Sequence, residues 1–177
     1  MIYMLLTDGF EDIEALETLD ILRRAGLETK TVGITSKTVK SSHGVTVFSD
    51  LVFEEADFSD IEMLILPGGP GHTAFSQSEK VVDLINTAAK SGIYIAAICA
   101  SPSVIGKLGL LKGRRFTCFP GFEDAVLGGI YSPDKVVSDG KFITARGAGA
   151  ASGFGFEIVT LFKGAVLANE LKKQMQY

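Results

Sequence analysis

One cysteine lies where a nucleophile could be presented to a substrate. Cys99 follows the uncharged apolar run Ile93–Ile98, which predicts a buried strand, and Pro102, three residues later, suits the first turn of a helix. With Ser101 available as a helix cap, this strand-to-helix turn resembles a nucleophile elbow. The free N–H groups and positive end of a helix stabilise a thiolate, so we predict a reactive Cys99 with a lowered pKa. The alternative is a buried cysteine that acts only as a small apolar side chain.

The second cysteine, Cys118, lies in the strand-like stretch 115–119 with no helix starting behind it, and we predict that it is inert. Two cysteines do not make a disulfide framework in a domain of this size. Only two histidines, His43 and His72, are present, so the sequence predicts no metal site.

An acidic side chain follows the first apolar run. Helical spacing places Glu14 on one row with Thr18, Ile21 and Ala25, which is a mostly apolar row. A desolvated carboxyl group has a raised pKa, so Glu14 could stay protonated near neutral pH and donate a hydrogen bond to a thiolate. The alternative is that Glu14 only stabilises the start of its helix, as acidic residues commonly do.

A glycine-rich loop, Pro67–Gly71, follows the apolar run Met63–Leu66. Small residues let a substrate approach the backbone, whose N–H groups could stabilise an oxyanion. A phosphate-binding loop is disfavoured, because neither the Lys-Ser/Thr pair of a P-loop nor a Gly-x-Gly-x-x-Gly helix start is present. A simple tight turn is the alternative.

The pattern of short apolar runs and amphipathic segments predicts a doubly wound α/β domain, mostly parallel, with helices on both faces of the sheet. Ligands then bind beyond the carboxyl ends of the strands, where residues 7–14, 67–72 and 99–103 lie. The segment 37–53 and the Asp139-Gly140 turn predict additional β structure. The expected strands are 1–6, 29–34, 63–66, 93–98 and 142–144, and the expected helices are about 12–25, 77–91, 102–110 and 152–174.

Composition agrees with one folded domain over residues 1–177. The chain is 46% apolar and 21% charged, with a net charge of −4, so we expect a large core and no nucleic-acid partner bound through phosphates. Met1–Leu6 lacks the basic start and long apolar centre of a signal peptide, and no apolar run is long enough to span a bilayer. We therefore expect a soluble cytoplasmic protein without a membrane partner.

Four segments together resemble the ThiJ/PfpI superfamily, most closely the branch that contains the parkinsonism-associated (DJ-one) protein. They are 8–14, 66–69, 96–102 and 139–147. The resemblance implies a three-layer, flavodoxin-like fold of the class I glutamine amidotransferase type, a homodimer, and no cofactor. It also implies that Cys99 is the nucleophile and redox-active residue, that Glu14 is its protonated partner, and that backbone N–H groups around Gly68, Gly69 and Ala100 form the oxyanion or substrate-binding site.

Several positions depart from the family pattern. Ala100 replaces the histidine that follows the nucleophile in protease-like members, and Phe119 takes the place of a histidine that many relatives carry; Ser101 stands where a glycine is common. A phenyl ring cannot carry protons, so chemistry that needs the missing histidine is in doubt. His72 is a possible auxiliary base, although an exposed loop histidine without a role is the alternative.

The sequence leaves two functions open, both centred on Cys99. One is a cofactor-independent enzyme for reactive carbonyls, of the glyoxalase or deglycase type, in which Glu14 moves protons. The other is an oxidative-stress sensor or chaperone, in which Cys99 is oxidised by peroxide to a sulfinate with little turnover. An amidase or peptidase is less favoured, because no base is predicted beside Cys99.

Overall fold

A seven-stranded sheet runs through the centre of the computed structural model, which describes residues 1–177. All neighbouring strands are parallel except β10, which runs antiparallel to β11 at one edge. This confirms the mostly parallel, doubly wound fold. In spatial order the strands are β10 (Val136–Asp139), β11 (Phe142–Ala145), β7 (Tyr94–Ile98), β6 (Met63–Leu66), β1 (Ile2–Leu6), β2 (Thr29–Gly33) and β5 (Leu51–Val52).

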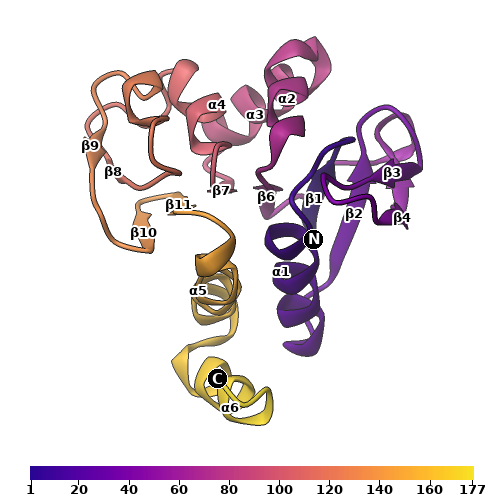
Figure 1. The fold of residues 1–177 in the computed structure, drawn as a ribbon, viewed down its shortest axis with the longest axis vertical. Coiled ribbons are helices and arrows are strands. Elements are labelled where there is room, and N and C mark those ends of the chain that lie inside the picture. Colours follow the sequence, from indigo (N-terminus) through magenta and orange to yellow (C-terminus); the bar gives the residue numbers. More distant parts are fainter.

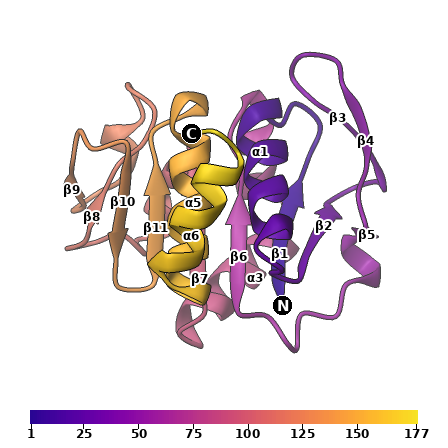
Figure 2. The same cartoon turned by 90° about the horizontal axis from the view of Figure 1, so that it is seen from below.

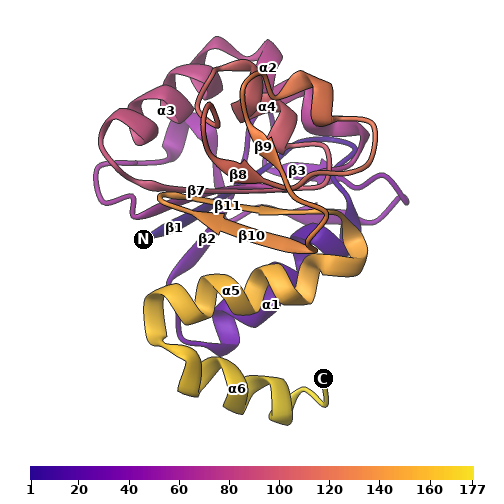
Figure 3. The same ribbon diagram turned by 90° about the vertical axis from the view of Figure 1, so that its left-hand side faces the viewer.

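Helices cover both faces of the sheet and complete three layers (Figures 1 and 3). One face carries α1 (Asp12–Arg24), α5 (Ala151–Lys163) and α6 (Ala165–Gln174), and the other carries α2 (Thr73–Gln77), α3 (Glu79–Lys90) and α4 (Pro102–Lys107). Helices α1 and α5 lie side by side against the sheet, and α6 packs outside α5 (Figure 2). Short 3₁₀ turns occur at Phe53–Glu55, Pro70–His72, Glu123–Ala125 and Ala148–Ala150.

Strand β1 shows why the apolar runs do not alternate with polar residues. Met4 and Leu6 belong to the core between the sheet and α1 and α5, whereas Tyr3 and Leu5 belong to the core on the opposite face. Both faces of the strand are therefore buried, and both must be apolar.

Three predicted elements differ from the observed ones. The predicted helix 152–174 is two helices, because Gly164 adopts φ 88° and ψ 159°, which a helix cannot contain. The predicted helix 102–110 ends at Lys107. The stretch 115–119 forms only β8 (Arg115–Phe116), which pairs with β9 (Ile130–Tyr131), so Cys118 lies beyond the strand.

Additional β structure is present where the sequence predicted it. In segment 37–53, β3 (Thr38–Lys40) and β4 (Thr46–Phe48) form an antiparallel hairpin, and β5 joins the main sheet. The Asp139-Gly140 turn connects β10 and β11. No helix combines the length and apolar character required to cross a bilayer.

Candidate active site

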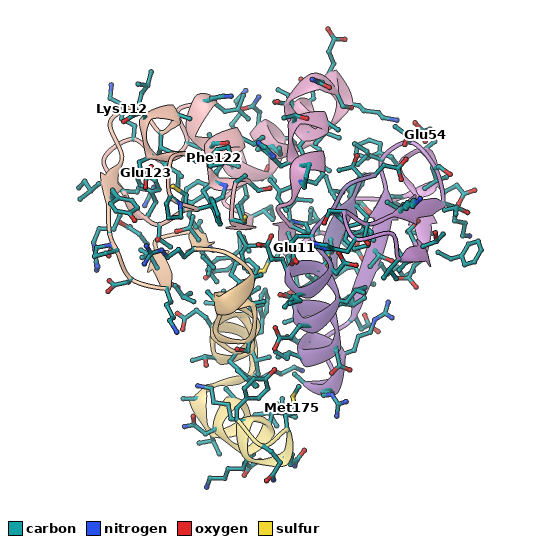
Figure 4. All side chains as sticks on the ribbon, in the orientation of Figure 1. Glu11, Glu54, Lys112, Phe122, Glu123 and Met175 are labelled. Carbon is teal, nitrogen blue, oxygen red and sulfur yellow. The ribbon has the colours of Figure 1, made fainter.

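The candidate site forms at the carboxyl ends of three neighbouring strands, β1, β6 and β7. Their connections begin at Thr7, Pro67 and Cys99, as the sequence predicted for a doubly wound sheet. In Figure 4, Glu11 marks the point where the first of these connections enters α1, in the middle of the molecule. Segments far apart in the chain thus meet at one edge of the sheet.

Cys99 has a backbone conformation that is rare for a side-chain-bearing residue. Its φ is 66°, and the turn is held by hydrogen bonds from the Cys99 N–H to the Ala145 carbonyl (2.8 Å) and from the Phe119 N–H to the Cys99 carbonyl (2.8 Å). Such left-handed residues typically cost about 1–3 kcal/mol and occur frequently at functional sites. Cys99 is partly exposed, whereas Cys118 is fully buried. The pKa is raised to about 12 for both thiols, so the two cysteines differ in exposure, and the inertness of Cys118 stays a prediction.

The Glu14 side chain is buried, with a relative exposure of 1%, as are Thr18, Ile21 and Ala25 on the same helical row. Its Oε2 accepts a hydrogen bond from the Gly68 N–H (2.9 Å). Burial raises the pKa of Glu14 to about 7. The hydrogen bond with Cys99 opposes this shift and the charge of Glu11 adds to it, while the Gly68 N–H again lowers the pKa.

Glu11 holds the start of α1 in place. Its carboxylate accepts the Glu14 N–H (2.7 Å), and its own N–H donates to the Gly68 carbonyl (3.0 Å). These two bonds connect the helix that carries Glu14 to the glycine loop.

The pKa of Cys99 is raised to about 12, which contradicts the lowered value predicted from the helix start. Burial is the largest cause, followed by the negative charge and hydrogen bond of Glu14. The N–H groups of Gly69 and Ala100 act in the opposite direction but do not outweigh these effects. Ser101 does not cap α4 either, since its hydroxyl donates to the Pro67 carbonyl (2.6 Å).

Glu14 and Cys99 therefore form one titrating pair with pKa values of about 7 and about 12. Between these values the pair keeps a single proton. Because a carboxylate then lies beside a thiol, proton transfer from sulfur to oxygen needs no third side chain. The product of that transfer is a thiolate next to a neutral carboxyl group, which is the state that the resemblance implied.

The glycine loop can lie this close to Cys99 and Glu14 only because Gly68 and Gly69 have no side chains. A Cβ on Gly68 would lie 2.5 Å from both the Cys99 Cβ and the Glu14 Oε2. Gly69 adopts φ 91°, and a Cβ there would lie 2.4 Å from the Gly9 carbonyl oxygen. Gly69 and Ala100 direct their N–H groups to the Cys99 sulfur, whereas the Gly68 N–H is already engaged by Glu14.

The candidate substitute for the missing family histidine, His72, makes its hydrogen bond with the glycine loop. His72 makes a hydrogen bond through Nδ1 with the Gly69 carbonyl (2.9 Å), and its ring meets Phe122 edge-on at 5.4 Å. It makes no hydrogen bond with Cys99. Phe119 is 47% exposed and packs near Phe122, so its ring gives the entrance an apolar wall.

A cavity of about 480 Å³ lies next to the pair, separated from Glu14 by Gly147. A Cβ on its lining residue Gly147 would lie 3.9 Å from the Glu14 Oε1 and 3.3 Å from the Phe119 ring. Two basic residues in this lining, Lys135 and Arg146, were not predicted as site residues. Their opposition follows from the observed register, in which Asp139 pairs with Phe142 and the turn is Gly140-Lys141. The cavity is lined by Phe119, Pro120, Lys135, Arg146, Gly147, Ala148, Gly149 and Ala150.

Glu11, Asp12 and His43 could supply ligand atoms for a cation, but these side chains already make hydrogen bonds within the chain. Oxygen and nitrogen atoms of Glu11, Asp12 and His43 lie within 4.8 Å of one another. Each is already used inside the chain: Glu11 at the helix start, and Asp12 in hydrogen bonds with His43 (2.8 Å) and the Ser41 hydroxyl (2.6 Å).

The chain is similar in sequence to several named proteins. The glutathione-independent glyoxalase DJR-1.2 of Caenorhabditis elegans is 32% identical over 174 residues, which are 97% of this chain and 93% of that protein. A deglycase of Pyrococcus abyssi is 31% identical over 164 residues, covering 92% of this chain and 99% of the deglycase. Protein DJ-1 homolog B of Arabidopsis thaliana is 34% identical over 171 residues, but this chain spans only 39% of its length.

The architecture is shared as well. A crystal structure of a DJ-1 superfamily protein from Salmonella typhimurium superposes with a TM-score of 0.94 at 31% identity, covering 99% of this chain and 97% of the other. Residues 1–161 match the DJ-1/PfpI family. The chain belongs to the DJ-1/PfpI family.

Proposed function

We propose that the protein is a cofactor-independent enzyme for reactive carbonyl compounds, of the glyoxalase or deglycase type. The observation that carries the proposal is a partly exposed Cys99, held in a left-handed turn, beside a buried Glu14 whose pKa is about 7. A group with that pKa can accept and return protons at neutral pH. The glyoxalase and deglycase names of relatives at 31–32% identity support the same class of reaction.

In the first step, ionised Glu14 takes the thiol proton of Cys99 as the sulfur attacks the aldehyde carbon. A C–S bond forms, and the electron pair of the C=O bond moves to oxygen. The N–H groups of Gly69 and Ala100 stabilise this oxygen or the thiolate, depending on which carries the charge. Protonation of the oxygen gives a hemithioacetal.

In the second step, a 1,2-dicarbonyl compound rearranges without an external oxidant. Glu14 removes the proton from the former aldehyde carbon, and the neighbouring ketone carbon receives a proton as it becomes an alcohol. The aldehyde carbon is thereby oxidised to a thioester while the ketone is reduced. Water then cleaves the C–S bond, releasing a 2-hydroxy acid and the free thiol.

The test is conversion of methylglyoxal to lactate in the absence of glutathione. We expect Cys99→Ala to fall to background and Glu14→Gln to lose on the order of 100-fold in kcat, since a positioned acid–base group contributes about 10²–10⁴. Cys118→Ala is the matched control and keeps wild-type turnover. Wild-type turnover by Cys99→Ala would overturn the proposal.

A redox function is the second candidate, and the difference in solvent exposure between Cys99 and Cys118 favours it. Oxidation follows exposure and thiolate character, and the neutral form of Glu14 can donate a hydrogen bond to a sulfinate oxygen. After mild peroxide treatment we expect a mass gain of about 32 Da, two oxygen atoms, on Cys99 and not on Cys118. Equal oxidation of both, or of neither, contradicts this candidate.

A further inference from the structure

Two basic residues lie directly opposite each other at the end of the β10–β11 hairpin. The register pairs Val136 with Ala145, so the next pair is Lys135 and Arg146, and the Arg146 N–H donates to the Lys135 carbonyl (3.0 Å). Directly opposed residues place their side chains on the same face of a sheet, and like charges in such a pair are destabilising. This arrangement is one that folding alone does not favour.

Neither cation is neutralised within the chain. No salt bridge involves Lys135 or Arg146, and the neighbouring carboxylate of Asp134 pairs instead with Arg115 (3.1 Å). In a protein with net charge −4, two adjacent unpaired cations leave a local positive potential that is available to an anion.

Both cations line the 480 Å³ cavity, and the residues on either side of Arg146 contact the reactive pair. The Ala145 carbonyl, one residue before Arg146, accepts the Cys99 N–H (2.8 Å), and a Cβ on Gly147, one residue after it, would lie 3.9 Å from the Glu14 Oε1. The apolar side chains of Phe119 and Pro120 form part of the wall. The cavity is larger than a three-carbon aldehyde requires, and Gly147 in its lining places the two cations next to the reactive pair.

We propose that Lys135 and Arg146 form an anion-binding subsite that selects carbonyl substrates with a carboxylate or phosphate group a few bonds from the aldehyde. The inference rests on the proposed function and names its substrate class. A guanidinium group and an ammonium group together match the oxygens of either anion. The aldehyde reaches Cys99 while the anionic group is bound by Lys135 and Arg146.

The kinetic test uses three 1,2-dicarbonyl probes: 4,5-dioxopentanoate, its neutral methyl ester, and the phosphate ester 3-phosphooxy-2-oxopropanal. Conversion of 4,5-dioxopentanoate with one water gives 2-hydroxyglutarate, so no further reactant is needed. We expect kcat/KM to favour at least one anionic probe over the methyl ester by on the order of tenfold. The preferred anion identifies the group that the subsite binds.

The matched variants are the double substitution Lys135→Gln/Arg146→Gln and the control Lys90→Gln, which removes an exposed cation on α3. The double variant loses the anion preference, and the control keeps it. Raising the salt concentration reduces the preference of the wild type, because screening weakens attraction between exposed charges. A wild type without anion preference, or a preference that survives in the double variant, overturns the subsite.

A second readout separates failure of the subsite from failure of the enzyme. The alkylation rate of Cys99 is measured with anionic iodoacetate and neutral iodoacetamide, and the ratio of the two rates is compared between proteins. Changes in thiol pKa cancel in this ratio. If no dicarbonyl is turned over, the proposed function fails. If the ratio of the iodoacetate rate to the iodoacetamide rate is also the same in the double variant as in the wild type, the subsite fails too. Turnover of the methyl ester without anion preference overturns the subsite alone.

Discussion

At the scale of single residues, the proposed chemistry depends on the Glu14–Cys99 pair and not on Cys99 alone. Burial and the neighbouring carboxylate raise the pKa of Cys99, and burial raises the pKa of Glu14. Each shift alone would leave its group less often ionised at neutral pH. Together they retain one proton between sulfur and oxygen over the neutral range, so attack by sulfur and proton transfer to Glu14 can occur in one step.

The raised pKa of Glu14 predicts a pH-dependent stability. In the unfolded chain this carboxyl has an ordinary pKa of 4.5, whereas in the folded protein it is about 7. The folded state therefore binds more protons between these values. The stability that Glu14 contributes is fully present below pH 4.5 and is lost as pH rises through 7. At 1.36 kcal/mol per pKa unit, the loss is about 3 kcal/mol.

We expect denaturant titrations at pH 5 and pH 8 to show this loss for the wild type and a much flatter dependence for Glu14→Gln. The glutamine can still accept the Gly68 N–H, so the variant removes the titration and keeps the hydrogen bond. Identical pH profiles for the two proteins would contradict a buried Glu14 with a raised pKa.

At the scale of elements, the site depends on how strands end. Strands β1, β6 and β7 finish side by side, and each is followed by a tight connection that carries one part of the site. Short connections after buried strands allow little movement, so Cys99, Glu14 and the glycine loop keep their mutual distances. The same hairpin end that fixes Arg146 beside the site also fixes Lys135.

The break between α5 and α6 predicts a glycine requirement at residue 164. The combination of φ 88° and ψ 159° is essentially restricted to glycine, and residues forced into such regions cost about 1–3 kcal/mol. We expect Gly164→Ala to lower the free energy of unfolding by this amount. Hydrogen exchange should show α6 losing protection first, since it packs outside α5 and away from the sheet (Figure 3).

Gly149→Ala is the comparison for that variant. Gly149 has no positive φ, and a Cβ there would meet no atom within 4 Å. If both alanine variants were equally stable, the backbone conformation of Gly164 would not be what separates the two helices.

At the scale of the whole molecule, exposed apolar side chains occur on the β3–β4 hairpin and on α1. Phe48 and Val45 of the hairpin are 78% and 47% exposed, and Ile13 of α1 is 50% exposed. The hairpin turn that carries Val45 bonds to the start of α1, through the Ser42 N–H to the Phe10 carbonyl and through His43 to Asp12. Exposed apolar groups of this kind are common at protein–protein interfaces.

The homodimer that the family resemblance implies remains a prediction, and this surface is where we place the contact. We expect light scattering to give about twice the mass of 18.9 kDa, and Phe48→Asp to shift the protein toward the monomer without unfolding it. The matched control Val166→Asp, at an exposed apolar residue on α6, should leave the mass unchanged. A wild-type monomer would contradict the prediction.

The sequence by itself determined the strands, their parallel arrangement and the three connections in which the site lies. Apolar runs without alternation indicate burial on both faces, and the helical row of Glu14, Thr18 and Ile21 indicated that the acid could be buried, which the structure shows. The family followed from the motifs in these same connections.

Tertiary structure decided the properties that depend on contacts between segments far apart in the sequence. The pKa of Cys99 could not be obtained from its own helix, because the dominant effects are burial and a carboxylate contributed by α1. The break at Gly164 did have a local signal, a glycine directly after Lys163, but the helix-forming residues on both sides made the predicted helix 152–174 run through it. The cavity and its two cations depend on the register of the β10–β11 hairpin and on the position of Gly147 beside Glu14, neither of which the sequence pattern predicted.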